Sequence, residues 1–320
     1  LVTFAGTLDG AYALTMAGAT AQTFGGAVGG ANPLASLTTG TGLSSINGGG
    51  VKTSGAQTYG GKVELGAPTT IEAETAAAVT FMGTVNSKTG GAEDFALTIA
   101  GKAQAEFKAE VGGVTPGIAS LTTGADTQTA IHTAQIKTSG AQTYGGALTL
   151  PEDATLTASA VTFAKTVDGP NSLTITGAAP QTFGGAVGGQ TALSSLTTST
   201  GESVITGGLV KTTGNQTYQG RVTASTNELT AETGATAYFQ AGFADDAKLL
   251  LKGNAEIKGG NVFSSFKVDN SQAAVGTSVN FEGGKRQIIK NAFGASDVDF
   301  KGKDATDRLV LGALGAGKWD

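Results

Sequence analysis

The sequence has no cysteine and few charged residues, which make up only 14% of its 320 positions. Without cysteine, disulfide bonds and thiolate metal sites are excluded. Globular domains usually carry about 25% charged residues. The formal net charge of −5 provides no basic surface for nucleic acid. No apolar run approaches the roughly 18 residues that a membrane-spanning helix needs.

Proline is also scarce, with 6 residues, whereas glycine occurs 51 times. Because the glycines do not recur at every third position, collagen is excluded. Disorder is the other interpretation of such a composition, but 39% of the chain is hydrophobic. Much of that fraction is Val, Ile, Leu and Phe flanked by Thr, which favours β-strands. The chain begins at Leu1 without a signal-like segment, so we expect a processed product or an excised fragment.

Internal repeats organise the sequence. A unit of about 80 residues occurs three times, at about 1–77, 78–159 and 160–235. Three strings mark the copies: Val-Thr-Phe at 2–4, 79–81 and 161–163; Gln-Thr-Phe-Gly-Gly-Ala-Val-Gly-Gly at 22–30 and 181–189; Lys-Thr-Ser-Gly-Ala-Gln-Thr-Tyr-Gly-Gly at 52–61 and 137–146, with a variant at 211–220.

Ten aromatic residues indicate a shorter step within each unit. They follow one another at intervals of 20, 35, 22, 26, 37, 19, 20, 35 and 21 residues. We interpret the longer intervals as two turns without an aromatic, so the step is about 20 residues, typical of a solenoid coil. The ten residues predicted to line the core are Phe4, Phe24, Tyr59, Phe81, Phe107, Tyr144, Phe163, Phe183, Tyr218 and Phe239.

Alternation of residue types predicts which side chains face inward. In the string 106–111, Phe107, Ala109 and Val111 alternate with charged residues, as in a half-buried strand. The same rule turns Tyr59, Gly61, Val63 and Leu65 inward, and glycine there suits a narrow core. Lys165 occupies a position that is glycine in the other copies, so we expect a bend or bulge there instead of a buried lysine.

These features predict an all-β fold, a right-handed parallel β-helix with coils of about 20 residues. Residues 1–235 form the repetitive solenoid. Residues 236–320 hold 11 of the 20 Lys and Arg, and are expected to form a diverged solenoid end or a C-terminal cap. Charge and irregularity at a terminal coil protect its unpaired strand edge.

The repeated strings at 21–30, 37–42, 46–51 and 53–61 resemble the shafts of filamentous-haemagglutinin-like adhesins and autotransporter passengers. The resemblance covers roughly residues 1–235. It implies a right-handed parallel β-helix and a secreted protein of the bacterial surface. The secretion domain and the transport-directing region of that family have no counterpart in this sequence.

Candidate catalytic groups are few. The single histidine, His132, aligns with Asn47 and Thr206 of the other copies, which indicates an ordinary polar turn. Paired acids can cleave glycosidic or polyuronate bonds, but here the pairs are scattered along the chain, as solvated turns would be: Glu72/Glu74, Glu93/Asp94, Glu152/Asp153 and Asp245/Asp246. We therefore expect no catalytic residue, no cofactor and no transition metal.

Three further patterns have structural or functional interpretations. The Gly-Gly pairs at 25–26 and 29–30 lack the Gly-Lys-Ser/Thr ending of a phosphate-binding loop, so we interpret them as corners. The equivalent residues Lys52, Lys137 and Lys211 either form a sparse basic line on one face or protect against edge aggregation. Weak calcium binding near Asp297–Asp307, through Asp297, Asp299, Asp304 and Asp307, remains open although the calcium-binding nonapeptide is missing.

Together these observations predict a structural shaft or passenger segment of a secreted bacterial surface adhesin, located extracellularly or on the cell surface. A self-assembling surface-layer, sheath or fibre subunit is the alternative within the same fold. A carbohydrate-active β-helix enzyme is the alternative from another class. The expected partner is either another copy, by head-to-tail stacking, or a receptor on a host or cell surface.

Overall fold

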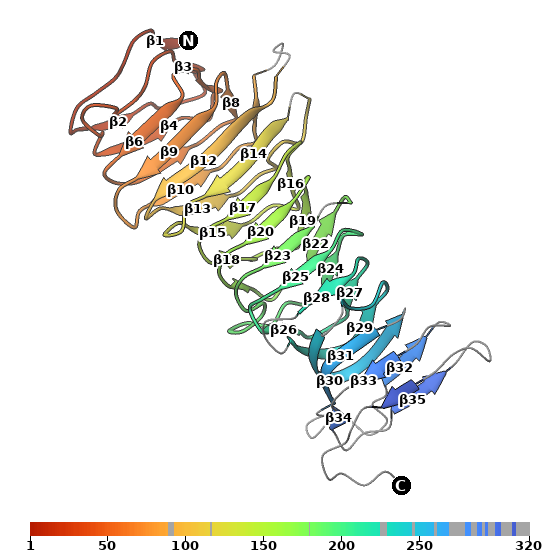
Figure 1. The fold of residues 1–320 in the computed structure, drawn as a ribbon. Coiled ribbons are helices and arrows are strands. Elements are labelled where there is room, and N and C mark those ends of the chain that lie inside the picture. The colour runs from red at the N-terminus through yellow and green to blue at the C-terminus, as the bar shows by residue number, and fades with distance from the viewer. Residues whose placement is uncertain are drawn as a thin grey trace. The chain divides into compact units, whose positions relative to one another are not determined.

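The computed structural model describes residues 1–88, 93–115, 117–178, 180–224, 229–244 and 247–258, together with short strands between 261 and 311. Throughout this described part the regular elements are β-strands, and no helix occurs. The strands are parallel and stack as a β-solenoid whose turns are about 21 residues apart (Figure 1), which confirms the predicted architecture. The chain divides into two compact units, Leu1–Ala164 and Lys165–Asp320.

The first unit has three sheets, and successive turns contribute either a strand or an isolated bridge to each sheet. Face A consists of β1 (Val2–Phe4), β3 (Gln22–Phe24), β5 (Ser44–Ile46), β8 (Val63–Leu65), β11 (Val85–Ser87), a bridge at Val111, β16 (Gln135–Lys137) and β19 (Ala154–Thr157). Face B consists of β2 (Ala13–Thr15), β4 (Ser36–Thr39), β7 (Gln57–Tyr59), β10 (Ala78–Phe81), β13 (Gln104–Phe107), β15 (Gln128–Ile131) and β18 (Leu148–Thr149).

Face C begins with bridges at Leu8 and Val28 and continues through β6 (Gly50–Thr53), β9 (Thr69–Ala73), β12 (Phe95–Gly101), β14 (Ile118–Thr123), β17 (Gln142–Tyr144) and β20 (Val161–Phe163). Along the chain each turn visits face A, then C, then B. Because each strand pairs with its equivalents one turn before and after, internal strands have hydrogen-bonded neighbours on both sides.

The aromatic residues form several separate stacks in the core. Phe4 stacks on Phe24, with ring centroids 5.5 Å apart, on face A. Phe81 lies between Tyr59 and Phe107, at 5.1 and 5.3 Å, on face B. Nine of the ten predicted core aromatics are at most 1% exposed; Phe4, in the first turn, is half-buried. The predicted set is therefore correct, and Phe243 is a buried aromatic that it missed.

The interpretation of the long intervals as two full turns was wrong. Phe24 pairs in register with Ile46, whereas Tyr59 pairs with Thr39 on another face. The interval of 35 residues therefore corresponds to one turn and two thirds. The next aromatic residue lies on a different face, and not two turns along the same face. The same change of face separates Phe107, which pairs with Ile131, from Tyr144, which pairs with Thr123.

The sequence repeat and the solenoid turn are consequently out of phase. The three copies of Val-Thr-Phe form β1 on face A, β10 on face B and β20 on face C. Each copy thus begins two thirds of a turn later than the one before. Identical strings occupy different faces because every face demands the same alternation of inward and outward residues.

The predicted side-chain directions hold in the first unit except at Ala109, which lies after the end of β13 and is only half-buried. Tyr59, Gly61, Val63 and Leu65 are buried, as are Phe107 and Val111. A Cβ atom at Gly61 would lie 2.2 Å from the carbonyl oxygen of Gly42 in the neighbouring turn. Only glycine fits so close an approach between backbones.

The second unit also has three sheets. One contains β21 (Val167–Asp168), bridged to β26 (Leu209–Thr212) through Val187, and continues into β29 (Leu229–Phe239), β30 (Ala247–Lys258), β31 (Asn261–Val268) and β34 (Ala292–Phe293). The second contains β22 (Leu173–Thr176), β24 (Leu196–Thr198), β27 (Gln216–Tyr218), the later halves of β29 and β30, β32 (Val279–Glu282) and β35 (Val298–Lys301).

The third sheet contains β23 (Gln181–Phe183), β25 (Ser203–Ile205), β28 (Val222–Thr223) and a bridge at Phe243. Two further short strands complete this unit. β33 (Gln287–Ile289) pairs with the first residues of β31, and β36 (Leu309–Leu311) pairs with β33. Lys165 is exposed in a bend before β21, which confirms that this lysine is not buried.

Candidate functional site

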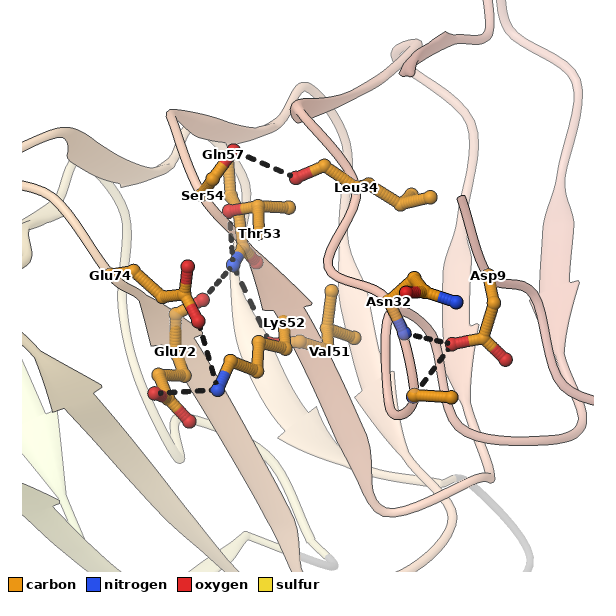
Figure 2. Close-up of polar contacts among 11 residues, drawn as sticks. Asp9, Asn32, Leu34, Val51, Lys52, Thr53, Ser54, Gln57, Glu72 and Glu74 are labelled. Carbon is orange, nitrogen blue, oxygen red and sulfur yellow. Dashed lines mark hydrogen bonds and ion pairs between the residues drawn. The ribbon is translucent and has the colours of Figure 1, made fainter. Parts of the chain in front are cut away.

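The most elaborate polar arrangement recurs inside the core, at the string Gln-Thr-Tyr. Gln57 is fully buried, and its Nε2 donates to Thr53 Oγ1 at 3.0 Å and to the carbonyl oxygen of Glu72 at 2.8 Å (Figure 2). Its Oε1 accepts a hydrogen bond from the Tyr59 hydroxyl at 2.8 Å. Thr53 Oγ1 donates in turn to the carbonyl oxygen of Gly55 at 2.6 Å. We call this chain of buried polar contacts a Gln spoke.

The same spoke occurs at Gln142 with Tyr144 and at Gln216 with Tyr218, where each tyrosine hydroxyl lies 3.0 Å from the glutamine Oε1. In the Gln-Thr-Phe copies the tyrosine donor is missing. At Gln181 the hydroxyl of Ser199 replaces it, donating to Oε1 at 2.6 Å. Burial raises the pKa of all three tyrosines, so they stay protonated donors. The spokes satisfy their own polar groups and leave none to bind a substrate.

An ion cluster lies on the outer surface beside the first spoke. Lys52 Nζ is 3.2 Å from Glu72 Oε1 and 3.1 Å from Glu74 Oε1 (Figure 2). Hydrogen bonds to these two carboxylates raise the pKa of Lys52. In the second unit Glu232 Oε2 lies 3.2 Å from Lys211, and its other carboxylate oxygen lies 2.6 Å from Lys252. The acidic pair Glu72/Glu74 thus shares one lysine of the neighbouring turn.

The hypothesis of a basic line through Lys52, Lys137 and Lys211 is wrong. Lys52 lies in β6 on face C, whereas Lys137 lies in β16 on face A. Two of the three lysines are also paired with glutamates on the next strand. The phase difference between repeat and turn is the physical reason, since it turns equivalent residues toward different sides.

A recurrent carboxylate contact escaped the sequence analysis. Asp9 Oδ1 accepts hydrogen bonds from the backbone N–H groups of Ala31 at 2.8 Å and Asn32 at 3.2 Å (Figure 2). Asp168 Oδ1 does the same for Gln190 and Thr191, at 2.8 and 3.3 Å. A pattern in the sequence could have indicated this contact, because an acidic residue or an amide follows the phenylalanine of each Val-Thr-Phe string by five positions.

The loop that Asp9 holds contains one of the predicted glycine corners. Gly29 has a φ of +69°, and a Cβ there would lie 2.1 Å from the carbonyl oxygen of Lys52. Gly112 and Gly188 repeat this conformation, with the same φ and the same conflict with Lys137 and Lys211. The chain continues from each of these three corners into a strand, and not into the helix that follows a phosphate-binding loop.

His132 lies at the turn after β15, half-buried, and its Nε2 is 3.3 Å from Lys108 Nζ. Lys108 also contacts Glu106 Oε2 at 3.1 Å. This outer-surface chain joins neighbouring turns. It has neither a nucleophile nor a second histidine, so it resembles the polar turn that the sequence predicted.

The remaining acids do not converge. Asp94 Oδ1 accepts a hydrogen bond from the backbone N–H of Gly117 at 2.8 Å, and the exposed pair Glu152/Asp153 lies before β19. The pair Asp245/Asp246 lies outside the described residues. Of the four aspartates suggested for calcium only Asp299 is described, and only by its backbone in β35. Within the described residues, no group of three or more His, Cys, Asp or Glu could hold a metal ion.

Among the residues that the structure describes, no helix is long and apolar enough to cross a membrane. Comparison with known proteins finds no matching family model, no matching curated protein and no matching solved structure. The function must therefore be argued from the fold and the surface.

Proposed function

We propose that the chain is a structural shaft segment of a secreted bacterial surface adhesin. In this role the solenoid holds a binding region away from the cell and carries mechanical load. Its partners are the adjoining parts of the adhesin and, through them, a receptor on a host or cell surface. No catalytic step is assigned to it.

The observation that supports this proposal is that inward residues are retained among copies that lie on different faces. Inward residues are retained: tyrosine at 59, 144 and 218, and glycine at 61, 146 and 220, all buried. The outward residue between that glycine and the next inward side chain changes from Lys62 to Ala147 to Arg221. Some outward residues are also retained, such as Lys52 and Lys137, but these copies lie on different faces and therefore form no continuous binding surface.

Single-molecule pulling of the whole chain from both ends tests the proposal. We expect extension in steps of about one turn, because each turn is a unit that contacts only its neighbours. Phe81→Ala should lower the force of the steps around β10, since it empties the stack between Tyr59 and Phe107. Lys62→Ala, an exposed outward substitution, should leave the forces unchanged.

If the chain were instead a carbohydrate-active enzyme, it should turn over a polysaccharide with the help of an acidic pair. Turnover of any member of a polysaccharide panel that disappears in the double variant Glu72→Gln, Glu74→Gln would contradict the shaft proposal. The double variant is informative because both carboxylates are on the surface and contact only Lys52 among the ion pairs of the described residues.

A second candidate is a self-assembling fibre or sheath subunit, in which another copy pairs with β1 of the first described turn. Its inner side chain Phe4 is only half-buried, and Val2 and Tyr12 are 40% and 84% exposed. Val2 N–H and Phe4 C=O bond to the next turn, which leaves the N–H of Thr3 on the open side of β1. Electron microscopy over a concentration series should show filaments that Thr3→Pro shortens. Monodisperse particles at high concentration would exclude this candidate.

A further inference from the structure

Three pairs of an acidic residue or its amide followed by glycine occur in the sequence: Asp9-Gly10, Asn47-Gly48 and Asp168-Gly169. At such a pair the glycine nitrogen can attack the side-chain carbonyl carbon of the preceding residue, because glycine has no side chain to hinder the approach. The product is a five-membered succinimide ring. A fold opposes this reaction when hydrogen bonds already hold the two reacting groups in place.

Both groups are held at the two Asp-Gly pairs. The Oδ1 atoms of Asp9 and Asp168 each accept hydrogen bonds from two backbone N–H groups of a loop in the neighbouring turn. The N–H groups of Gly10 and Gly169 each donate to a carbonyl oxygen of that loop at 3.2 Å. An ionised carboxylate is also a poorer electrophile than an amide, so these two pairs are protected against ring closure.

The pair Asn47-Gly48 follows β5 and lacks both kinds of contact. Among the described residues, Asn47 Oδ1 is the one buried side-chain oxygen or nitrogen that has no hydrogen-bond partner. In that part of the chain the N–H of Gly48 makes no hydrogen bond either. By contrast Gly207, at the equivalent place in the third copy, donates its N–H to the carbonyl oxygen of Phe183 at 3.1 Å. The attacking nitrogen and the amide are therefore both unengaged only at Asn47-Gly48.

The main chain after Asn47 has the freedom that ring closure needs. Residues 48–50 are three consecutive glycines, and Gly49 has a φ of +73°. A Cβ atom at Gly50 would meet nothing within 4 Å, and one at Gly49 would meet only the carbonyl oxygen of Pro68 at 3.3 Å. Residues 47–50 are half-buried, so water reaches them. The glycine run lets the backbone turn toward the amide without steric conflict.

We propose that Asn47 is a site of spontaneous deamidation in the folded chain. The nitrogen of Gly48 loses its proton to solvent base and forms a bond to Asn47 Cγ. The Cγ–Nδ2 bond breaks, and Nδ2 takes up a proton and leaves as ammonia. Water then opens the succinimide at one of its two carbonyl carbons. Attack at Cγ gives aspartate, whereas attack at the main-chain carbonyl carbon gives isoaspartate, in which the main chain runs through Cγ.

Either product disturbs the packing of this turn. Asn47 Oδ1 lies over Gly66 of the next turn, where a Cβ atom would be 2.0 Å from it. An aspartate places a charge at this buried position, where no donor compensates it. An isoaspartate adds one main-chain carbon before β6 and so disturbs the register of β6 with β9. This turn therefore weakens as the protein ages, whether or not the chain is a shaft.

The test is to incubate the purified chain at neutral and at mildly alkaline pH and to map its peptides by mass spectrometry. Replacement of the amide by a hydroxyl appears as a gain in mass, and isoaspartate is detected by enzymatic methylation of its carboxylate. We expect Asn47 to convert within about tenfold of its rate in a synthetic peptide of residues 43–52, which allows about 1.4 kcal/mol of added barrier. Conversion should be faster at the higher pH, because the attacking nitrogen must lose its proton. Asp9 and Asp168 should stay unmethylated in the same sample.

The matched control is Asn47→Thr, because threonine stands at the equivalent place in the third copy, at Thr206. This variant should fold like the wild-type chain and should not change on incubation. Hydrogen exchange of the aged wild-type chain should accelerate in peptides that cover β5, β6 and β8, and stay unchanged in peptides from β17. Aged Asn47→Thr should show no acceleration.

Three outcomes would overturn the inference. The first is conversion of Asn47 slower than in the peptide by more than about tenfold, since the fold would then protect the pair. The second is methylation of Asp9 and Asp168 as fast as in their own peptides, since hydrogen bonding would then not decide which pair reacts. The third is full conversion of Asn47 with unchanged hydrogen exchange, since the modification would then leave the turn intact.

Discussion

Removing one buried hydroxyl from a Gln spoke should destabilise the neighbouring turns measurably. In Tyr59→Phe the aromatic stack with Phe81 is retained, but Gln57 Oε1 loses its donor at 2.8 Å. Both residues are 0% exposed, so water does not replace the lost contact. Leaving a buried acceptor unsatisfied costs about 1–3 kcal/mol.

Hydrogen exchange is the suitable assay because a solenoid opens locally, turn by turn, and one global midpoint would average the effect. A loss of 1–3 kcal/mol corresponds to exchange that is about 5- to 150-fold faster. We expect this acceleration in peptides that cover β4, β7 and β10, which pair around Tyr59. Peptides from β17 and β20 should be unaffected.

Tyr12→Phe is the matched control, since that hydroxyl belongs to a side chain that is 84% exposed. Its exchange rates should equal those of the wild-type chain. If Tyr59→Phe changed exchange around β7 by less than twofold, the spokes would be incidental contacts. The replacement of tyrosine by Ser199 at the Gln181 spoke would then have no energetic meaning.

Further predictions concern backbone approach, core packing and charge. Gly61→Ala places a Cβ 2.2 Å from the Gly42 carbonyl oxygen, so it should lower local stability by about 1–3 kcal/mol, measured by hydrogen exchange of the neighbouring strands. Gly50→Ala, with nothing within 4 Å, should not. Phe81→Ala should cost about 3–5 kcal/mol by the same measurement, and a cost like that of an exposed residue would contradict the stacking. Glu232 has a pKa lowered first by the hydrogen bond from Lys252, so its contribution is present above the ordinary glutamate pKa and is lost as pH falls through the lowered value. Because Glu232 is partly exposed, that contribution is a few tenths of a kcal/mol, and Glu232→Gln should show a smaller fall in melting temperature between pH 7 and pH 3 than the wild-type chain.

Strand direction, core residues and approximate coil length were predictable because they depend on local alternation and on recurrence at a fixed step. Tyr59 to Leu65 shows the alternation directly, and the predicted inward side chains are buried. The buried glutamines followed the same rule, since Gln57 lies two positions before Tyr59. They were not predicted, because a glutamine is rarely fully buried and the partners that make it acceptable come from other strands.

The number of faces could not be derived from spacing alone. An interval of 35 residues fits two short turns as well as one turn and two thirds. Only pairing in space shows that Phe24 continues to Ile46 on face A while Tyr59 lies on face B. The error about the basic line followed directly from this one. The Asp9 contact was missed for a related reason, since it spans 22 residues and becomes local only when turns are stacked.

The phase difference also bears on what the repeated strings can encode. A string that forms β1 on face A, β10 on face B and β20 on face C points its outward residues in different directions. It cannot build one continuous binding surface, so its recurrence is explained by the packing of a turn. A surface feature that does run straight must be assembled from unlike segments. Face C gives an example: Thr122 belongs to a Leu-Thr-Thr string, Thr143 to Gln-Thr-Tyr and Thr162 to Val-Thr-Phe, and pairing between turns brings these three outward residues into one line.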